Sequence, residues 1–323
     1  MKQESRNKNI DIARGIAIIL MVMGHIGFGA RFDFYIHTFH MPFWFLISGY
    51  FYKQNSIENC VVKNVKNLIV PYIVYGIADI MFTWVLKKGF PVSDLKHLLW
   101  INQEGITVSG ALWFLTAMFF CQITMHLIIK YISNCYLRTT VVVALFIFGV
   151  SIKCLIHAYL PWALNAALVG GLLYYIGWMA KEKFYIFHEI FEKCGPIIYI
   201  LWVGISAFMC NMNSYINMRT SSYGNPILFI VNAVNMTLLL YGVSVFISRY
   251  KMIKEVLTYI GENSITYLCT NQIVIIGCTY VCEKIGIMHS TQNIIVLMFS
   301  LMIMTVGSFI VNGTNLRYTI GRF

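Results

Sequence analysis

The sequence has few charged residues. Asp, Glu, Lys and Arg make up 11% of its 323 residues, and only 13 residues are acidic, whereas about a quarter of an ordinary soluble domain is charged. Hydrophobic residues make up 59% of the chain, and the mean hydropathy is +0.70. This balance excludes an ordinary soluble globular protein and predicts an all-α, polytopic integral membrane protein that has the lipid bilayer around it.

The cysteines form no recognisable framework. None of the nine Cys residues belongs to a CxxC pair. The closest two, Cys278 and Cys282, are one helical turn apart inside an apolar run, which favours packing over a metal or redox site. We therefore expect no disulfide framework and no metal site.

The net charge of +11 does not indicate a nucleic-acid partner, because the basic residues lie between apolar runs, where they set membrane topology. Ten runs reach or approach the length of about 17 to 25 residues that spans a bilayer. These runs lie at 10–30, 34–52, 67–86, 109–130, 139–157, 162–180, 196–210, 226–248, 259–282 and 292–312. The sequence therefore predicts about ten transmembrane helices.

The connections between these runs predict the orientation of the chain. Segments on the same side as the N-terminus carry most of the Lys and Arg residues. Because such an excess marks the cytoplasmic side, we expect both termini in the cytoplasm and the loop at 87–108 outside. Ten spans leave only short connections, so we expect one transmembrane domain over residues 1–323 and no appended soluble domain.

Two ionisable residues in the first apolar run share one helix face. Arg14 and His25 are eleven residues apart, which is about three turns and about 16 Å along a helix axis. An arginine at the centre of a membrane helix costs about 2.5–3.5 kcal/mol on insertion scales, so such residues usually face a polar cavity or a partner. The spacing places Arg14 near the cytoplasmic surface and His25 near the middle of the membrane.

Several elements of the first fifty residues occur together in a familiar order. They are Asp11, Arg14 followed after ten residues by His25, the Phe-His-Met-Pro element at 39–42 and the Ser-Gly-Tyr element at 48–50. In this order they resemble the opening of the bacterial membrane acyltransferase-3 family, and most closely its fucose O-acetylase-like branch. Members of that family acylate, and mostly acetylate, sugars of cell-surface glycans.

The resemblance implies a multi-pass protein of the bacterial inner membrane that works as an O-acyltransferase, with acetyl as the expected group. Acyl-CoA, here acetyl-CoA, would be a co-substrate, and no cofactor would be bound permanently. The acceptor would be a hydroxyl of a cell-surface saccharide or of its lipid-linked precursor.

On this basis His25 is the predicted general base that deprotonates the acceptor hydroxyl. As an alternative, it is a polar residue that bonds a neighbouring membrane helix. Arg14 is predicted to bind the donor phosphates or to orient His25, and it can also pair with Asp11 one turn earlier. Lys63 and Lys66 stand where the family often has an Arg-x-x-Arg. They can meet donor phosphates as point charges or simply set topology.

The remaining predicted site residues shape the acceptor side. Pro42 can open the backbone of a membrane helix, and His40 beside it can contact the acceptor or His25. Ser48 and Gly49 follow the family pattern as site architecture. Trp113 resembles the Trp of a Trp-Phe-Leu element at the start of a span, but it can also be an ordinary interfacial aromatic.

A late element, Gly261-x-x-Ser264, resembles the start of another family helix. Many members carry a His further along, where this chain has Thr270, Asn271 and Gln272. Asn271 or Gln272 can still hydrogen-bond an acceptor sugar. Among the other histidines, His37 is expected near the outer surface, and the rest have no sequence neighbours that single them out.

A transporter or flippase for a glycan or small polar substrate is the main alternative, because carriers also place a polar site at the middle of a helix bundle. The sequence shows no obvious inverted hydropathy repeat, and its ionisable residues cluster in the first two runs. Both observations favour the enzyme.

Overall fold

The computed structural model describes residues 7–87, 89–103, 108 and 110–322. Its principal elements are helices, and the only strand-like pairing in the described residues is one antiparallel bridge between Asn217 and Ser222. The helices are α1 (Lys8–Ile26), α2 (Ala30–His37), α3 (His40–Tyr50), α4 (Ile57–Asn64), α5 (Val70–Lys87), α6 (Val92–Leu99), α7 (Trp113–Tyr131), α8 (Cys135–Ile156), α9 (Leu164–Ala180), α10 (Phe184–Lys193), α11 (Pro196–Asn211), α12 (Pro226–Ile247), α13 (Lys251–Glu262), α14 (Ser264–Ile285) and α15 (His289–Gly313). The all-α class is confirmed.

Eight helical segments within the described residues are long and apolar enough to cross a membrane. They are Lys8–Ile26, Ile57–Leu86, Trp113–Tyr131, Cys135–Lys153, Pro161–Lys193, Pro226–Ile247, Ser264–Ile285 and Thr291–Gly313. This confirms a polytopic membrane protein. Two expected spans are not among the eight: run 34–52 is divided between α2 and α3, and run 196–210 forms α11, which has only 16 residues.

The break between α2 and α3 follows from Pro42. A proline ring clashes with the carbonyl four residues earlier, which belongs to Thr38, so the helix cannot continue through that point. The chain leaves helical geometry at Phe39, and Pro42 falls in the first turn of α3, where its missing N–H costs no helical bond. His40 Nδ1 lies 2.7 Å from the Ile36 carbonyl oxygen, which also accepts from the Phe39 N–H at 3.2 Å. Pro42 therefore divides the expected span rather than kinking it.

The stretch around Lys63 and Lys66, which was expected to connect two spans, is helical. α4 and α5 form one continuous helical segment, Ile57–Leu86, joined by a π-helical turn at Val65–Ile69 in which the Val70 N–H bonds the Val65 carbonyl. Pro71 follows directly. The wider turn accommodates a proline that cannot donate a backbone hydrogen bond.

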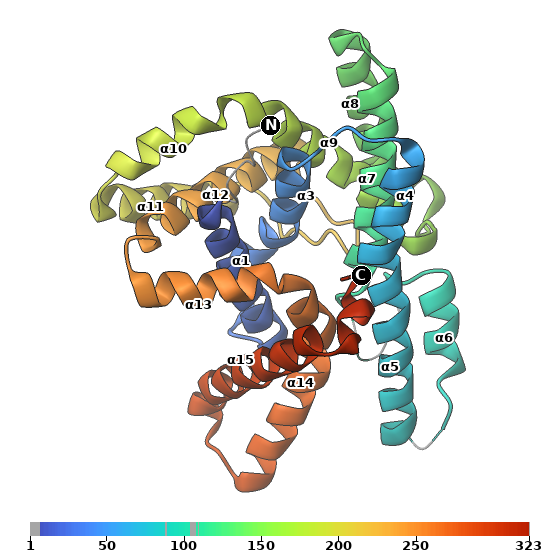
Figure 1. Ribbon diagram of the computed structural model, residues 1–323, viewed down its shortest axis with the longest axis vertical. Helices are drawn as coiled ribbons and strands as arrows, with labels where there is room; N and C mark the ends of the chain where they lie inside the picture. Colours follow the sequence, from blue (N-terminus) through green and yellow to red (C-terminus); the bar gives the residue numbers. More distant parts are fainter. Residues whose placement is uncertain (1–6, 88, 104–107, 109, 323) are drawn as a thin grey trace.

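α1 lies near the centre of the fold, beside α3, α12, α13 and α14 (Figure 1). Two glycines bring α1 against α13. A Cβ atom on Gly15 would overlap the Leu257 carbonyl, and a Cβ atom on Gly261 would overlap the Asp11 carbonyl. Small residues at such positions let membrane helices approach through their backbones. Gly261, which we noted only as part of a motif, thus has a packing role beside the first helix.

A second close contact joins α3 and α9. A Cβ atom on Gly49 would overlap the Tyr174 carbonyl, and one on Gly177 would overlap the Leu46 carbonyl. The short helix α3 is therefore fixed by backbone contact with one of the eight spanning segments. α3 in turn carries His40 and Ser48, so this contact positions residues predicted for the site.

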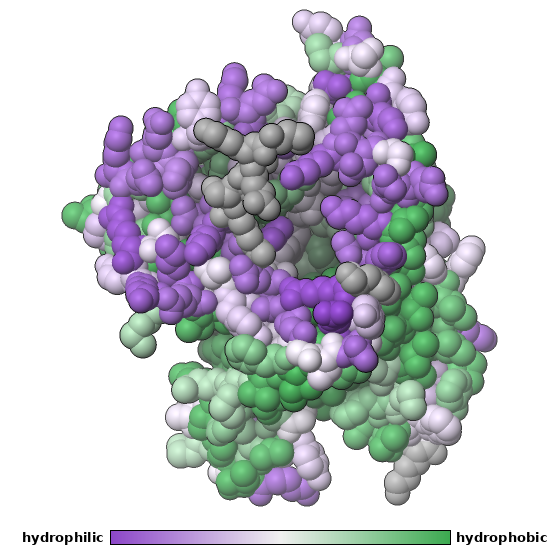
Figure 2. Space-filling view, in the orientation of Figure 1, coloured by the Kyte–Doolittle hydropathy of each residue, from purple (hydrophilic) through white to green (hydrophobic). Residues whose placement is uncertain are grey.

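The surface divides by polarity (Figure 2). Hydrophilic residues gather over α4, α10 and α13, whereas hydrophobic residues cover α5, α14 and α15. The hydrophilic face holds the basic segments that we assigned to the cytoplasm, and that assignment stays a prediction.

Candidate functional site

Two cavities touch α1 at different heights. The first, called the outer cavity, has a volume of about 280 Å³ and includes His25. The second, called the inner cavity, has a volume of about 240 Å³ and includes Arg14. The two residues that share a face of α1 therefore belong to separate chambers of the same bundle.

His25 lies in the last turn of α1, two residues before the left-handed cap at Gly27. It is closer to the outer end of the helix than the spacing alone led us to expect. Its side chain is exposed to the outer cavity. A histidine at this place can meet a substrate that enters from outside the bundle.

A hydrogen-bonded chain orients His25. The Gly110 N–H donates to Gln272 Oε1 at 2.6 Å, and Gln272 Nε2 lies 3.3 Å from His25 Nδ1. A backbone N–H can only donate, so it fixes which end of the Gln272 amide faces His25. The amide NH₂ then donates to Nδ1, which must carry the lone pair. In this arrangement the neutral ring holds its proton on Nε2.

The wall opposite His25 is polar and comes from α2 and the loop between α11 and α12. Tyr215 donates its hydroxyl to Asp33 Oδ2 at 2.8 Å, and His37 Nδ1 lies 3.0 Å from Asp33 Oδ1. Burial and the neighbouring Asp33 carboxylate raise the pKa of Tyr215, so its hydroxyl remains a donor. Arg219 also lines this cavity and donates through Nε to the Gln103 carbonyl at 2.7 Å.

The predicted acceptor residues divide into two groups. His40 and Trp113 line the outer cavity, and Trp113 is the first residue of α7 and is buried rather than interfacial. Asn271 and Ser264 do not line either cavity. The Asn271 amide donates instead to the Leu268 carbonyl at 2.6 Å. Of Asn271 and Gln272, the two residues that we considered for contact with the acceptor, only Gln272 lines the outer cavity.

The inner cavity is rich in cations, amides and aromatic rings. Arg14, Lys53 and Lys63 contribute positive charge, and Ser48 also lines the wall. The remaining lining residues are Phe51, Tyr52, Asn55, Cys60, Asn64, Asn67, Leu68, Gln122, His126 and Tyr174. Lys66 is not among them, although Asn67 and Leu68 of the same π-helical turn are. Of the two lysines predicted to bind the donor, only Lys63 lines the inner cavity, and the donor role of both stays a prediction.

Arg14 makes the local pair and faces the cavity at the same time. Its Nη1 lies 3.4 Å from Asp11 Oδ1, and its guanidinium carbon lies 5.2 Å from the centre of the Phe51 ring. Asp11 is buried, and Arg14 is partly exposed. The two alternatives that the sequence left open are therefore compatible.

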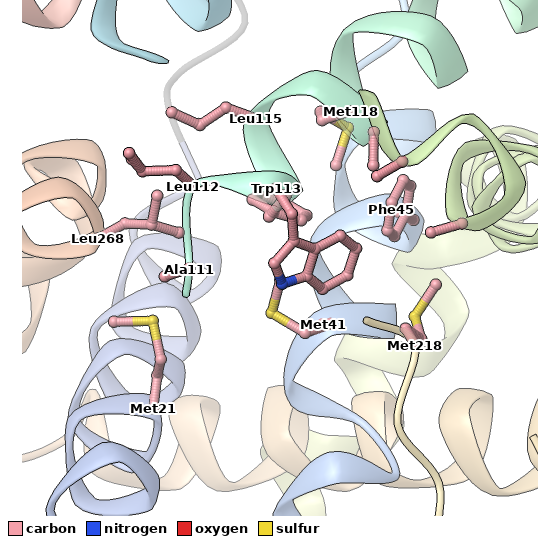
Figure 3. Close-up of a cluster of buried hydrophobic side chains, with 14 of the residues drawn as sticks. Met21, Met41, Phe45, Ala111, Leu112, Trp113, Leu115, Met118, Met218 and Leu268 are labelled. Carbon is pink, nitrogen blue, oxygen red and sulfur yellow. The ribbon is translucent and has the colours of Figure 1, made fainter. Parts of the chain in front are cut away.

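Between Arg14 and His25, α1 packs into a layer of buried apolar side chains (Figure 3). Met21 of α1, Met41 of α3 and Trp113 of α7 converge there, backed by residues such as Phe45 and Met118. Met21 lines the outer cavity seven residues after Arg14, so about 10 Å of α1 lies between residues that line the two cavities. A reacting group that passes from one cavity to the other must cross this layer.

Sequence reasoning missed several residues of both cavities. Asp33, Tyr215 and Arg219 come together only through the tertiary fold, and no local pattern marked them. His126 had a usable signal, since it is an ionisable residue in an apolar run. Its Nδ1 lies 3.4 Å from the Tyr52 hydroxyl. In the described residues, no group of three or more His, Cys, Asp or Glu side chains is placed to hold a metal ion.

Comparison with known proteins gave one result. A family model described as an acyltransferase domain matches residues 7–313. Searches of curated proteins and of solved structures gave no match. The matched range covers almost the whole chain and includes every residue of both cavities.

Proposed function

The chain belongs to the acyltransferase-3 family of membrane acyltransferases, and from this premise we propose that it moves an acyl group, acetyl in the first instance, from cytoplasmic acyl-CoA to a saccharide hydroxyl. We further propose that it is a bacterial inner-membrane enzyme of the fucose O-acetylase-like branch. The acceptor is a cell-surface glycan or its lipid-linked precursor. The family match gives no support to the alternative of a transporter.

One observation carries the proposal: a single helix presents Arg14 to the inner cavity and His25 to the outer cavity. The inner cavity suits the nucleotide part of acyl-CoA. Its cations can bind phosphates, and its aromatic rings can stack on a base. The pantetheine arm then extends along α1 through the apolar layer and brings the thioester to the outer cavity.

The outer cavity suits a sugar. It combines an aromatic side chain, Trp113, with donors and acceptors such as Tyr215 and Asp33. In the proposed step His25 takes the proton of the acceptor hydroxyl as its oxygen attacks the thioester carbonyl. The new C–O ester bond forms, the C–S bond breaks, and CoA leaves as a thiolate that takes the proton back from His25.

The donor site is tested by Arg14→Lys. A guanidinium offers a planar set of donors that matches phosphate, whereas an ammonium does not. We expect the KM for acetyl-CoA to rise about tenfold, which corresponds to the loss of one hydrogen bond to a charged group. Acetyl-CoA consumption in purified membranes, measured against its concentration, gives this value.

The matched control is Arg249→Lys. Arg249 stacks on Phe246 and bonds the Glu192 carbonyl outside both cavities. It should leave the KM unchanged. If Arg14→Lys also leaves KM and rate unchanged, Arg14 does not contact the donor.

Gln272 gives a test of which His25 nitrogen acts as the base. Because the Gln272 amide donates to Nδ1, we propose that the acceptor hydroxyl replaces that amide and gives its proton to Nδ1. Glutamate cannot donate and would instead accept from Nδ1–H, which places the proton on the wrong nitrogen. We expect Gln272→Glu to lower kcat by about tenfold, and Gln272→Ala to lower it less, since alanine leaves both tautomers accessible.

A lower kcat for Gln272→Glu than for Gln272→Ala would assign the base to Nδ1. The measurement is kcat at saturating acetyl-CoA. A Gln272→Glu enzyme that is as fast as the parent, or faster than Gln272→Ala, would assign the base to Nε2.

A further inference from the structure

A third cavity lies away from both chambers, between the first half of α8 and the end of α9. Its volume is about 940 Å³. The groove begins beside Arg138 in the first turns of α8 and runs along that helix to Ile147, a rise of about 13 Å. It has a polar end and an apolar end, and the function proposed above uses neither.

An arginine is held in place at the polar end. The guanidinium carbon of Arg138 lies 4.6 Å from the centre of the Trp178 ring, and Tyr175 and Trp178 are stacked with their centroids 5.5 Å apart. Arg138 donates through Nε to the Tyr175 hydroxyl at 3.3 Å and through Nη1 to the Ile132 carbonyl at 3.2 Å. These bonds leave further N–H donors of its five for a ligand.

The charge at this end favours an anion. Lys181 also lines the groove and donates through Nζ to the Tyr52 carbonyl at 3.3 Å, and Glu182 contributes one opposing charge. The groove therefore has an excess of positive charge, and its most rigid charged group is a guanidinium, which matches phosphate geometry. The N-terminus of α8 adds a favourable helix dipole.

The other end of the groove is apolar and exposed. Val143, Ala144 and Ile147 line it, and only 22% of the α8 span is buried, against 61% for the span that contains α9. α8 thus lies at the edge of the bundle, where lipid chains surround it. The whole groove, about 13 Å from Arg138 to Ile147, is about as long as half of a hydrocarbon core of about 30 Å.

From these features we infer that the α8–α9 groove binds an anionic phospholipid of the inner leaflet. The phosphate meets Arg138 and Lys181, and one acyl chain lies along Val143, Ala144 and Ile147. Cationic pockets between membrane helices on the cytoplasmic side are a recognised setting for anionic lipid headgroups. The inference uses the predicted orientation, in which both cations face the cytoplasm.

Lipid retention by the purified protein tests the inference. The full-length protein, in detergent, would be incubated with equal amounts of phosphatidylglycerol and phosphatidylcholine, and bound lipid would be measured by native mass spectrometry. We expect the protein to retain phosphatidylglycerol selectively. Arg138→Gln should weaken this binding about fivefold, the effect of one cation near a membrane surface.

Two further variants distinguish lipid binding in the groove from a general effect of positive charge. Ala144→Phe fills the apolar part without changing charge and should also lower retention. Arg249→Gln removes an equal charge next to another aromatic ring, Phe246, and should have no effect. Soluble glycerol phosphate, which has the headgroup but no chains, should not compete.

Other outcomes would overturn the inference. They are unchanged retention in both Arg138→Gln and Ala144→Phe, equal retention of phosphatidylcholine, or competition by glycerol phosphate. The last would mean that the groove binds soluble phosphates and not a lipid.

Discussion

His25→Ala is expected to stop acyl transfer and leave the protein abundant in the membrane. Loss of a general base typically lowers a rate by about 10²–10⁴. His25 is exposed to the outer cavity in the last turn of α1, so truncation opens no new space in the packed core. Losing a structural hydrogen bond between membrane helices costs only about 0.6 kcal/mol on average.

Glycan acylation and protein level should be measured on the same cells, by mass spectrometry of surface glycans and by immunoblot. His188→Ala is a matched control, because His188 lies on α10 and bonds Tyr241 outside both cavities. A normally abundant His25→Ala protein that acylates at the parental rate would end the proposed mechanism, and the transporter alternative would then come first.

Gly49→Ala is expected to prevent stable folding. The added methyl group would overlap the Tyr174 carbonyl, and a backbone atom cannot move aside as a flexible side chain can. Overpacking of a core costs about 1–3 kcal/mol even where side chains adjust, so separation of α3 from α9 should cost at least that much. The measurements are the yield and the Tm of the purified protein.

Gly204→Ala is the control for Gly49→Ala. Gly204 is on α11, and a Cβ atom there would meet nothing within 4 Å. Since alanine favours helix over glycine by up to about 1 kcal/mol, this variant should be as stable as the parent or slightly more stable. A Gly49→Ala protein with the parental yield and Tm would show that α3 and α9 are not in backbone contact.

The parts of the fold that depend on local pattern could be predicted from the sequence. Apolar runs indicated the all-α membrane class, and the spacing of Arg14 and His25 anticipated their shared helix but not its two separate cavities. The division of run 34–52 into two helices could not be predicted from hydropathy. It depends on a clash between the Pro42 ring and the carbonyl of residue 38, which acts over a single turn and does not change hydropathy.

The composition of the two cavities depends on contacts between distant segments. Gln272 faces His25 and the adjacent Asn271 does not, because one position along α14 rotates a side chain by about 100°. Lys66 is absent from the inner cavity for a similar reason, since its neighbours Asn67 and Leu68 on the π-helical turn at Val65–Ile69 line the cavity and Lys66 does not. Such differences follow from helix rotation and packing, which residue type alone does not determine.

The apolar layer between the cavities has an electrical consequence. Met21, Met41 and Trp113 carry no charge, and in the proposed orientation part of the transmembrane voltage falls across this layer. Moving one elementary charge through that field costs or yields about 2.3 kcal/mol per 100 mV. A neutral acyl thioester crosses without electrical work, while the CoA phosphates stay with Arg14 on one side. In the proposed reaction the voltage therefore neither drives nor opposes acyl transfer.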